Sequence, residues 1–158
     1  MAVIVICVDT SVAAKWVLEE PDSDLATSLY TDAIDADQAI YATPLIRFEV
    51  ANVIRRRMLA RGLPLPEAHR IFAQFLRFDV QLLMPDGIFP RALAIVSELA
   101  IPAIYDATYI ALAESLGCDY WTADGKIHRV VSHRYPFVRL LDTYIPASSP
   151  SDPQTTST

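Results

Sequence analysis

Near its N-terminus the chain carries an unbroken apolar run that ends on an acid. Residues 3–8 are all apolar, and Asp9 follows them directly, before Thr10 and Ser11. A short continuous apolar run is typical of a parallel strand that is buried on both faces, because helices cover both sides of such a sheet. The run therefore predicts a parallel α/β sheet whose first strand ends on a carboxylate.

Strand and helix signals alternate along the rest of the chain. Pro44 stands at the first turn of one predicted helix, and Gly62 lies just past its end. The further predicted strands are residues 39–42, 80–84, 118–121 and 138–141. The predicted helices are residues 11–18, 22–36, 44–61, 66–78, 89–100, 104–116 and 127–132. We expect a three-layer α/β/α domain with a mostly parallel sheet of about five strands, joined by right-handed crossovers.

Length and composition limit the class of protein. The chain has 158 residues, of which 53% are hydrophobic and 20% are charged, so a single domain can bury a substantial core. We expect this domain over residues 1–145 and a disordered Pro/Ser/Thr-rich tail over residues 146–158. No apolar run is long enough to span a bilayer, and no basic region precedes the apolar start. We therefore expect a cytoplasmic protein that does not enter a membrane.

Four acids are predicted to meet at one edge of the sheet. Asp9 follows the first strand, and Asp124 follows the strand at residues 118–121 by a few positions. Glu49 lies in the second turn of a helix that follows a strand, and Asp106 opens a helix whose N-terminus returns to the same edge. An all-oxygen cluster without His or Cys suits Mg²⁺ or Mn²⁺. Such an ion can lower the pKa of a bound water and stabilise a phosphoryl oxygen.

Each acid also has a structural interpretation that the sequence leaves open. Asp9 and Asp106 could cap helices, and Asp124 begins a common turn dipeptide. Glu49 is harder to explain in this way, because it lies in an apolar stripe where an unpaired carboxylate is costly. Three short polar residues near the acids are accessory candidates that could orient a ligand or a water: Thr10, Asn52 and Thr122.

Four segments, taken in their order, resemble a PIN domain. They are DTS at residues 9–11, FEVAN at residues 48–52, YDATYIALA at residues 105–113 and TAD at residues 122–124. The match extends over roughly residues 3–143, and the most similar subgroup is the VapC-like toxins of bacterial and archaeal toxin–antitoxin pairs. The chain departs from this subgroup at Gly125, where a charged residue is common.

The resemblance implies a Mg²⁺- or Mn²⁺-dependent endoribonuclease that is usually a homodimer. It also implies an antitoxin partner whose C-terminal segment occupies the acidic groove. By matching position, the acidic quartet would be Asp9, Glu49, Asp106 and Asp124, with Thr10, Asn52 and Thr122 as accessory residues. We hypothesise that the first three acids hold an ion whose bound water attacks an RNA phosphodiester. Asp124 would then hold a second ion or an outer-shell water.

Charge is unevenly distributed along a chain whose net charge is −6. Residues 19–37 contain only acids among their charged residues, whereas residues 47–77 are rich in arginine. The arginine-rich stretch is either a solvated helix face or a surface that contacts phosphate groups. The candidate contacts to RNA or to an antitoxin are Arg55, Arg56, Arg57 and Arg61.

Two other functions remain open at this point. A phospho-accepting receiver domain would use Asp9, Asp86 and Thr122, but the chain lacks the acidic pair at the first strand and the Lys at the last strand that such a domain needs. A PIN-like domain retained only for partner binding would have the same fold without catalysis. Three aromatic residues are candidates either for stacking on RNA bases or for packing in the core: Tyr105, Tyr109 and Trp121.

Overall fold

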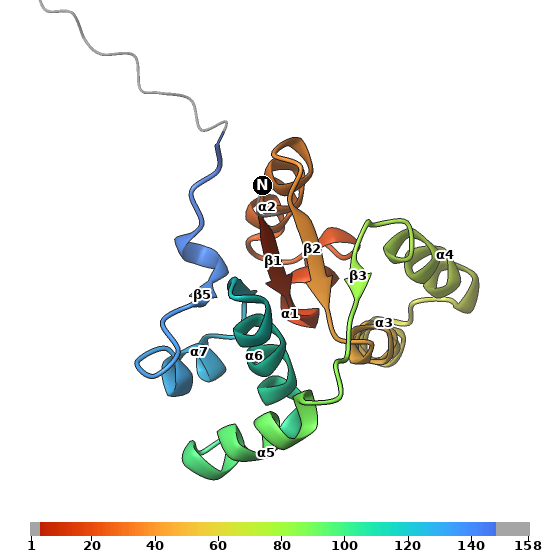
Figure 1. The fold of residues 1–158 in the computed structure, drawn as a ribbon. Helices are drawn as coiled ribbons and strands as arrows, with labels where there is room; N and C mark the ends of the chain where they lie inside the picture. The colour runs from red at the N-terminus through yellow and green to blue at the C-terminus, as the bar shows by residue number, and fades with distance from the viewer. Residues whose placement is uncertain (1–3, 148–158) are drawn as a thin grey trace, which may run out of the picture.

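The first predicted strand forms the centre of a five-stranded parallel sheet (Figure 1). The computed structural model describes residues 4–147, so Val3 of the predicted strand lies outside the described residues. The strands are β1 (Val5–Val8), β2 (Ala39–Ala42), β3 (Gln81–Leu82), β4 (Asp119–Thr122) and β5 (Val138–Leu140). They follow the order β3-β2-β1-β4-β5, and every neighbouring pair is parallel. A central parallel strand needs cover on both faces, which explains the unbroken apolar sequence of β1.

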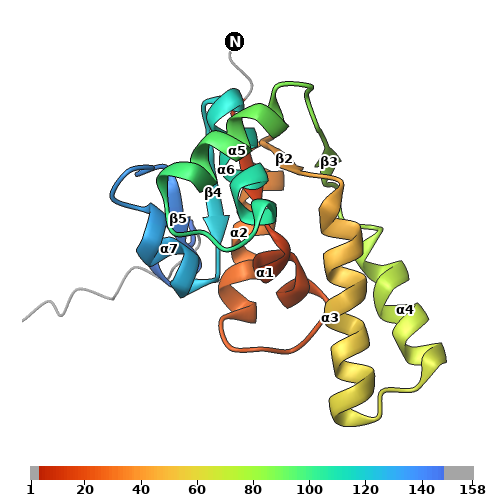
Figure 2. The same cartoon turned by 90° about the horizontal axis from the view of Figure 1, so that it is seen from below.

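Helices cover both faces of this sheet. They are α1 (Thr10–Ala13), α2 (Ser23–Asp35), α3 (Leu45–Arg61), α4 (Leu65–Phe75), α5 (Ile88–Glu98), α6 (Ile104–Leu116) and α7 (Gly125–Val131), with short 3₁₀ helices η1 (Ala14–Trp16) and η2 (Leu141–Thr143). Figures 1 and 2 show α5 and α6 on one side of the sheet and α1 and α2 on the other. The predicted three-layer arrangement is confirmed, and the strand count agrees with the expectation of about five.

Helix α6 is the most deeply buried helix segment near the site. Every residue from 107 to 113 is buried, and the side chains of Ile110 and Leu112 are completely so. The helix packs against β1 and β4 on one side and against α5 on the other. Because this packing leaves α6 little freedom, the first turn of the helix, which carries Asp106, is held rigidly at the edge of the sheet.

The helix predicted at residues 66–78 ends three residues early, at Phe75. Phe78 instead turns into an aromatic cluster, with its ring centroid 5.0 Å from that of Trp16 and 4.8 Å from that of Tyr30. The strand predicted at residues 80–84 is correspondingly reduced to the two residues of β3. Tertiary packing of one aromatic side chain therefore overrides the local helical pattern.

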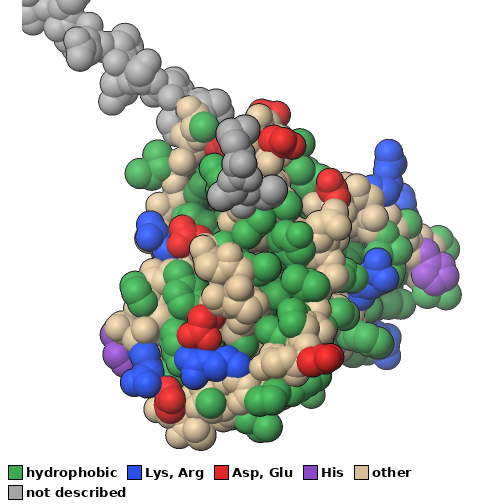
Figure 3. All heavy atoms as spheres, in the orientation of Figure 1, with side chains coloured by type: hydrophobic (Ala, Val, Ile, Leu, Met, Phe, Trp, Pro, Cys, Tyr) green, Lys and Arg blue, Asp and Glu red, His purple; other side chains and the backbone are tan. Residues whose placement is uncertain are grey.

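The uneven charge of the sequence is visible on the surface. Figure 3 shows acidic side chains over the end of α2 and basic side chains over α4. Within residues 4–147, no helix combines the length and apolar character that crossing a bilayer requires. Residues 148–158 of the predicted tail lie outside the described residues, so the structure does not test that part of the prediction.

Two glycines with open space around them predict opposite effects of substitution by alanine. Gly62 ends α3 at φ +66°, whereas Gly125 lies in α7 without a positive φ, and a Cβ would meet nothing within 4 Å at either position. We expect Gly62→Ala to lower the free energy of unfolding by about 1 kcal/mol, through left-handed backbone strain. Gly125→Ala should raise it by about 0.5 kcal/mol, through a more restricted unfolded chain. Urea denaturation of the two variants beside the unaltered protein measures both shifts, and equal shifts would contradict the backbone argument.

Candidate active site

One cavity at the carboxyl edge of the sheet collects all four candidate acids. It has a volume of about 370 Å³, and its walls include Asp9, Glu49, Asp106 and Asp124. These residues come from the end of β1, from α3, from the first turn of α6 and from the residue before α7. Parallel strands deliver their carboxyl ends to one edge, and the helices between them return their N-termini to it. The topology thus places four carboxylates from distant segments around one hollow.

Asp9 is the most buried of the four, with 5% of its surface exposed. Its Oδ1 accepts hydrogen bonds from the backbone N–H groups of Ser11 and Val12, at 2.9 and 3.4 Å, which caps α1. The Ser11 hydroxyl donates to the same oxygen at 2.5 Å, and the Tyr120 hydroxyl donates to Oδ2 at 2.6 Å. Burial raises the pKa of Asp9, and these hydrogen bonds lower it in part. Asp9 is therefore a helix cap and also presents an oxygen with spare acceptor capacity to the cavity.

Glu49 is half-buried on α3 and is held by a tyrosine. The Tyr109 hydroxyl, on α6, donates to Glu49 Oε1 at 2.8 Å. Burial is the main cause that raises the pKa of Glu49, the Tyr109 hydrogen bond opposes it, and the Asp9 charge adds to it. Tyr109 and Tyr120 are both almost fully buried, and their rings stack with centroids 5.9 Å apart. Burial also raises the pKa of both phenols, so they remain protonated donors to the carboxylates.

Asp106 is the acid on which the other three act most clearly. The capping position of α6 is Ala103, so Asp106 stands inside the first turn and the capping interpretation of this residue is wrong. Its pKa is raised to about 6, first by burial and then by the negative charges of Asp9, Asp124 and Glu49. The negative charges of the other three acids therefore all act on Asp106 and disfavour its ionised form.

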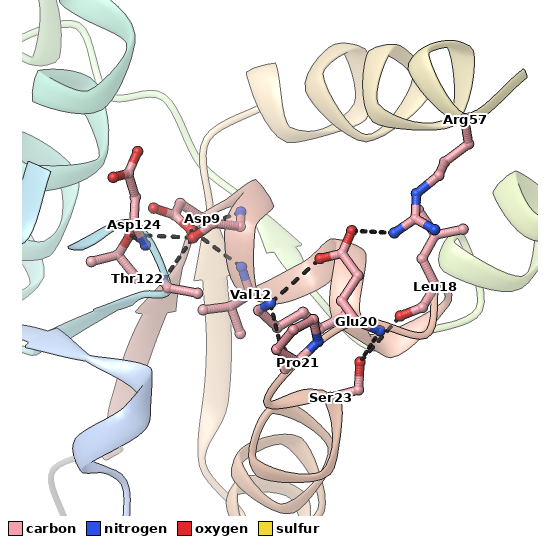
Figure 4. A network of polar contacts seen from close by, with 12 residues as sticks. Asp9, Val12, Leu18, Glu20, Pro21, Ser23, Arg57, Thr122 and Asp124 are labelled. Atoms are coloured by element: carbon pink, nitrogen blue, oxygen red, sulfur yellow. Dashed lines mark hydrogen bonds and ion pairs between the residues drawn. The ribbon is translucent and has the colours of Figure 1, made fainter. Parts of the chain in front are cut away.

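Asp124 caps α7 with one oxygen and leaves the other to the cavity. Its Oδ1 accepts hydrogen bonds from the N–H groups of Lys126, at 2.9 Å, and Ile127, at 3.3 Å. Figure 4 shows Asp124 beside Asp9, across the ends of β4 and β1. Gly125 is the first residue of α7, so the turn suggested by Asp124–Gly125 is a helix start.

Two hydroxyl groups hold the ends of β1 and β4 together. Ser11 Oγ accepts a hydrogen bond from the N–H of Ala123 at 2.7 Å and lies 3.2 Å from Thr122 Oγ1. Thr122 Oγ1 in turn accepts from the N–H of Asp124 at 3.1 Å. Thr122 is fully buried and does not line the cavity, so it orients the Asp124 backbone rather than a ligand directly. The other two accessory candidates, Thr10 and Asn52, do line the cavity.

The four candidate arginines fall into different environments. Arg57 is half-buried and forms an ion pair with Glu20, with Arg57 Nη2 2.8 Å from Glu20 Oε1. Arg56 lines the acidic cavity. Arg55 and Arg61 are exposed and lie outside the cavity walls. The four arginines therefore do not share one environment, and their contacts with RNA or an antitoxin stay a prediction.

Sequence patterns did not point to three other residues at this site, Lys15, Glu20 and Tyr120. The strand pattern could have indicated Tyr120, because alternate residues of a strand point to the same face and Tyr120 lies two positions before Thr122 in β4. Lys15 and Glu20 line the cavity from the segment around η1, where no local periodicity marks them. Of the three aromatic candidates, Tyr109 and Trp121 are buried in the core and Tyr105 is exposed.

The donor set at the cavity fits a hard divalent cation, although the carboxylates are spread around its walls. No three His, Cys, Asp or Glu side chains among residues 4–147 stand close enough together to hold an ion as they are placed. Thr10 Oγ1 is buried beside Glu49 and Tyr109 and makes no hydrogen bond of good geometry within the described part of the chain. An orphaned oxygen beside acids with spare acceptor capacity is what a cation with oxygen ligands would satisfy.

Residues 6–132 match the PIN domain family. Because the match spans well over half of the sequence, the chain belongs to the PIN domain family. Over 89 residues it is 32% identical to Ribonuclease VapC9 of Mycobacterium tuberculosis and, equally, to a VapC ribonuclease of Mycobacterium bovis. Each alignment covers 56% of this chain and 68% of the relative. The VapC subgroup that the sequence resembles is thus also the subgroup of its relatives.

Solved structures share the fold at lower sequence identity. VapC20 of Mycobacterium tuberculosis, described as a sarcin-ricin loop cleaving toxin, has a TM-score of 0.60 at 19% identity and covers 85% of this chain and 98% of its own. VapBC2 of Rickettsia felis, bound to a DNA fragment from its promoter, has a TM-score of 0.62 at 12% identity and covers 87% and 97%. These likenesses establish the common architecture.

The receiver-domain alternative is not supported. Asp86, which that function would need beside Asp9, is exposed in the loop after β3 and does not line the acidic cavity. The family match also assigns the sequence to a different class. A binding-only PIN domain is compatible with the fold and is separated from a nuclease by the activity tests below.

The burial of Asp106 and the carboxylates around it predict a metal-free protein that loses stability as the pH rises. Because the pKa of Asp106 is raised to about 6, the folded state keeps this proton longer than the unfolded state, and stability falls between about pH 4 and pH 6. Asp106→Asn should remove this loss and stabilise the metal-free protein at pH 7 by about 1 kcal/mol, a value discounted for partial exposure. Urea denaturation with a chelator, at pH 4 and pH 7, measures the difference.

Asp142→Asn serves as the matched control, because Asp142 is an exposed aspartate outside the cavity. It should leave the pH dependence unchanged. Identical pH profiles for Asp106→Asn and the unaltered protein would show that burial and the neighbouring acids do not raise the pKa of Asp106.

Proposed function

We propose that this protein is a metal-dependent endoribonuclease and the toxin of a toxin–antitoxin pair. The observation that carries the proposal is the cavity in which Asp106 faces Asp9, Glu49 and Asp124. An acidic, oxygen-only site suits chemistry on phosphate esters, where a cation must offset the charge of both protein and substrate. The family membership and the VapC ribonuclease relatives support RNA as the substrate.

The roles that we propose follow from the contacts of each carboxylate. Asp106 accepts no hydrogen bond from the described residues, so both of its oxygens are available to Mg²⁺ or Mn²⁺. Asp9 would add Oδ2, and Glu49 would add the oxygen that Tyr109 does not hold. A bound ion of this kind lowers the pKa of a water and stabilises charge on a phosphoryl oxygen. Asp124, whose Oδ1 caps α7 and whose Oδ2 accepts no hydrogen bond from the described residues, would orient a water or hold a second ion.

Buried tyrosines would keep this arrangement ready for the substrate. Tyr109 donates to Glu49 at 2.8 Å and leaves the other Glu49 oxygen free of hydrogen bonds from the described residues. Tyr120 donates to Asp9 Oδ2 at 2.6 Å, and because Oδ1 is held by Ser11 and Val12, the whole Asp9 carboxylate is fixed in place. Outer contacts of this type position the groups that bind an ion. The accessory residues Thr10 and Asn52 would contact the ion's waters or the RNA, while Thr122 maintains the strand end.

The partners that we propose are an RNA substrate, an antitoxin and a second copy of the chain. Two neighbouring solved structures are toxin–antitoxin complexes by their descriptions, which supports an antitoxin for this chain. Large hydrophobic side chains remain exposed on α3 and α5 and support pairing of two copies: Phe48, Leu59, Phe89 and Leu93. We further propose that residues 1–145 form the nuclease domain and that it acts in the cytoplasm, where RNA and newly made antitoxin coexist.

RNA cleavage should depend on the acids that line the cavity. Asp106→Asn and Glu49→Gln should each reduce Mn²⁺-dependent cleavage of single-stranded RNA by about a hundredfold or more, because each removes a charge that stabilises the ion. Cleavage is followed on labelled oligonucleotides by gel electrophoresis, with a chelator added and then titrated out with Mn²⁺. Asp142→Asn should retain full activity. Undiminished cleavage by Asp106→Asn would remove this residue from the mechanism.

The toxin function should depend on the same acidic site. Expression of the unaltered protein should arrest bacterial growth, and Asp106→Asn at the same protein level should not. Co-expression of a small protein encoded beside this gene should restore growth if that protein is the antitoxin. Growth arrest that persists with Asp106→Asn would separate any toxicity from the acidic site. Cleavage in vitro without growth arrest would instead favour a nuclease that is not a toxin.

A further inference from the structure

Basic side chains share the walls of the acidic cavity. Lys15 approaches it from η1, and Arg56 approaches it from α3. Glu20 also lines this side. Carboxylates still outnumber the basic groups around the hollow, so an RNA phosphate would be repelled unless a free cationic group guides it. Which basic side chain is free is therefore the question that decides how RNA approaches.

Glu20 occupies two of the basic groups in this region. Its Oε1 lies 2.8 Å from Arg57 Nη2, and its Oε2 lies 3.4 Å from Lys15 Nζ. Lys15 Nζ also donates to the carbonyl oxygen of Pro21 at 2.8 Å. The Lys15, Glu20 and Arg57 side chains are only 12%, 24% and 23% exposed, and Figure 4 shows Glu20 and Arg57 facing each other between the loop and α3. Lys15 and Arg57 are thus held by the protein itself.

Arg56 is in a different position from its neighbour Arg57. It is exposed, lines the cavity and forms no ion pair with any residue in the range 4–147. Glu49, Asn52 and Arg56 all line the cavity, which places them on one face of α3. Arg56 lies seven positions after Glu49 in the helix, which is about 10 Å along the axis. That separation is larger than one phosphate group, so Glu49 and Arg56 can contact different phosphates of one strand.

We propose that Arg56 binds the RNA backbone phosphate adjacent to the one that is cut, and so directs the strand along α3. This inference rests on the proposed ribonuclease function. The planar guanidinium can donate two parallel hydrogen bonds to a phosphate, which fixes direction as well as position. Asn52, one turn nearer to Glu49, lies on the path between the two phosphates. Arg57 stabilises the fold through Glu20 and does not contact the substrate.

The binding test compares two adjacent arginines on one helix. Arg56→Ala and Arg55→Ala make the same change of charge at exposed positions, but only Arg56 lines the cavity. Fluorescence anisotropy with a labelled single-stranded RNA, in a chelator and at several salt concentrations, should show about tenfold weaker binding for Arg56→Ala at low salt. The slope of log K against log salt should fall by about 0.7, the value for one contact to a single strand. Arg55→Ala should change binding by less than about twofold.

A conservative variant separates charge from geometry. Arg56→Lys should keep the salt slope of the unaltered protein, since the charge remains, but should bind RNA more weakly because the two parallel hydrogen bonds are lost. Thermal unfolding of all three variants checks that exposed substitutions leave the fold intact. An Arg56→Ala protein that binds RNA as the unaltered protein does would overturn the inference.

Kinetics with Mn²⁺ distinguish this inference from the function on which it rests. Arg56→Ala should raise KM about tenfold and leave kcat within about twofold, because Arg56 does not touch the reacting phosphate. A loss of kcat at unchanged KM would place Arg56 at the reacting centre and contradict the proposal.

If the unaltered protein cleaves no RNA, the proposed function fails, while the anisotropy result still decides the role of Arg56. A variant that handles RNA normally but escapes an inhibitory antitoxin would assign Arg56 to that partner and overturn the inference.

Discussion

The buried carboxylate of Asp9 is the interaction around which this site is organised. It caps α1, accepts a hydrogen bond from Tyr120 in β4, and follows directly from the central strand β1. A buried carboxylate without such donors would be very costly. Its N–H and hydroxyl donors instead make it the point where β1, α1 and β4 are joined. Asp9 therefore joins three elements at the centre of the fold and also lines the acidic cavity.

The other acids are kept at a distance from Asp9 by rigid elements. Glu49 is held through Tyr109, and Asp106 is held by the tightly packed helix α6. Hydrogen-bond donors thus stabilise the negative charges of Asp9 and Glu49. Asp106 has no such donor among the described residues, and its pKa is raised to about 6. Local conflict of this kind is expected where function, rather than stability, has selected the residues. A divalent cation is the natural complement to the charge that remains.

Much of this arrangement follows from local signals in the sequence. The apolar run before Asp9 predicts the central strand, and Pro44 and Gly62 bracket α3 almost to the residue. Because strand ends and helix starts of a parallel sheet share one edge, their order also indicates that the acids meet. Local signals failed at Phe78, whose contacts with Trp16 and Tyr30 end α4 early. Helical periodicity cannot report such a contact, because it depends on elements far away in the chain.

By itself, the sequence determined the order of strands and helices, the family and the identity of the four acids, since caps, turns and apolar periodicity act over a few residues. Only the tertiary structure decided which carboxylate oxygens remain available and which arginine lines the cavity without an ion pair among the described residues. Tyr120 and Asp9 are 111 positions apart, and Arg57 and Glu20 are 37 apart. Contacts over such distances arise when the complete core packs, so no local pattern of residues contains them.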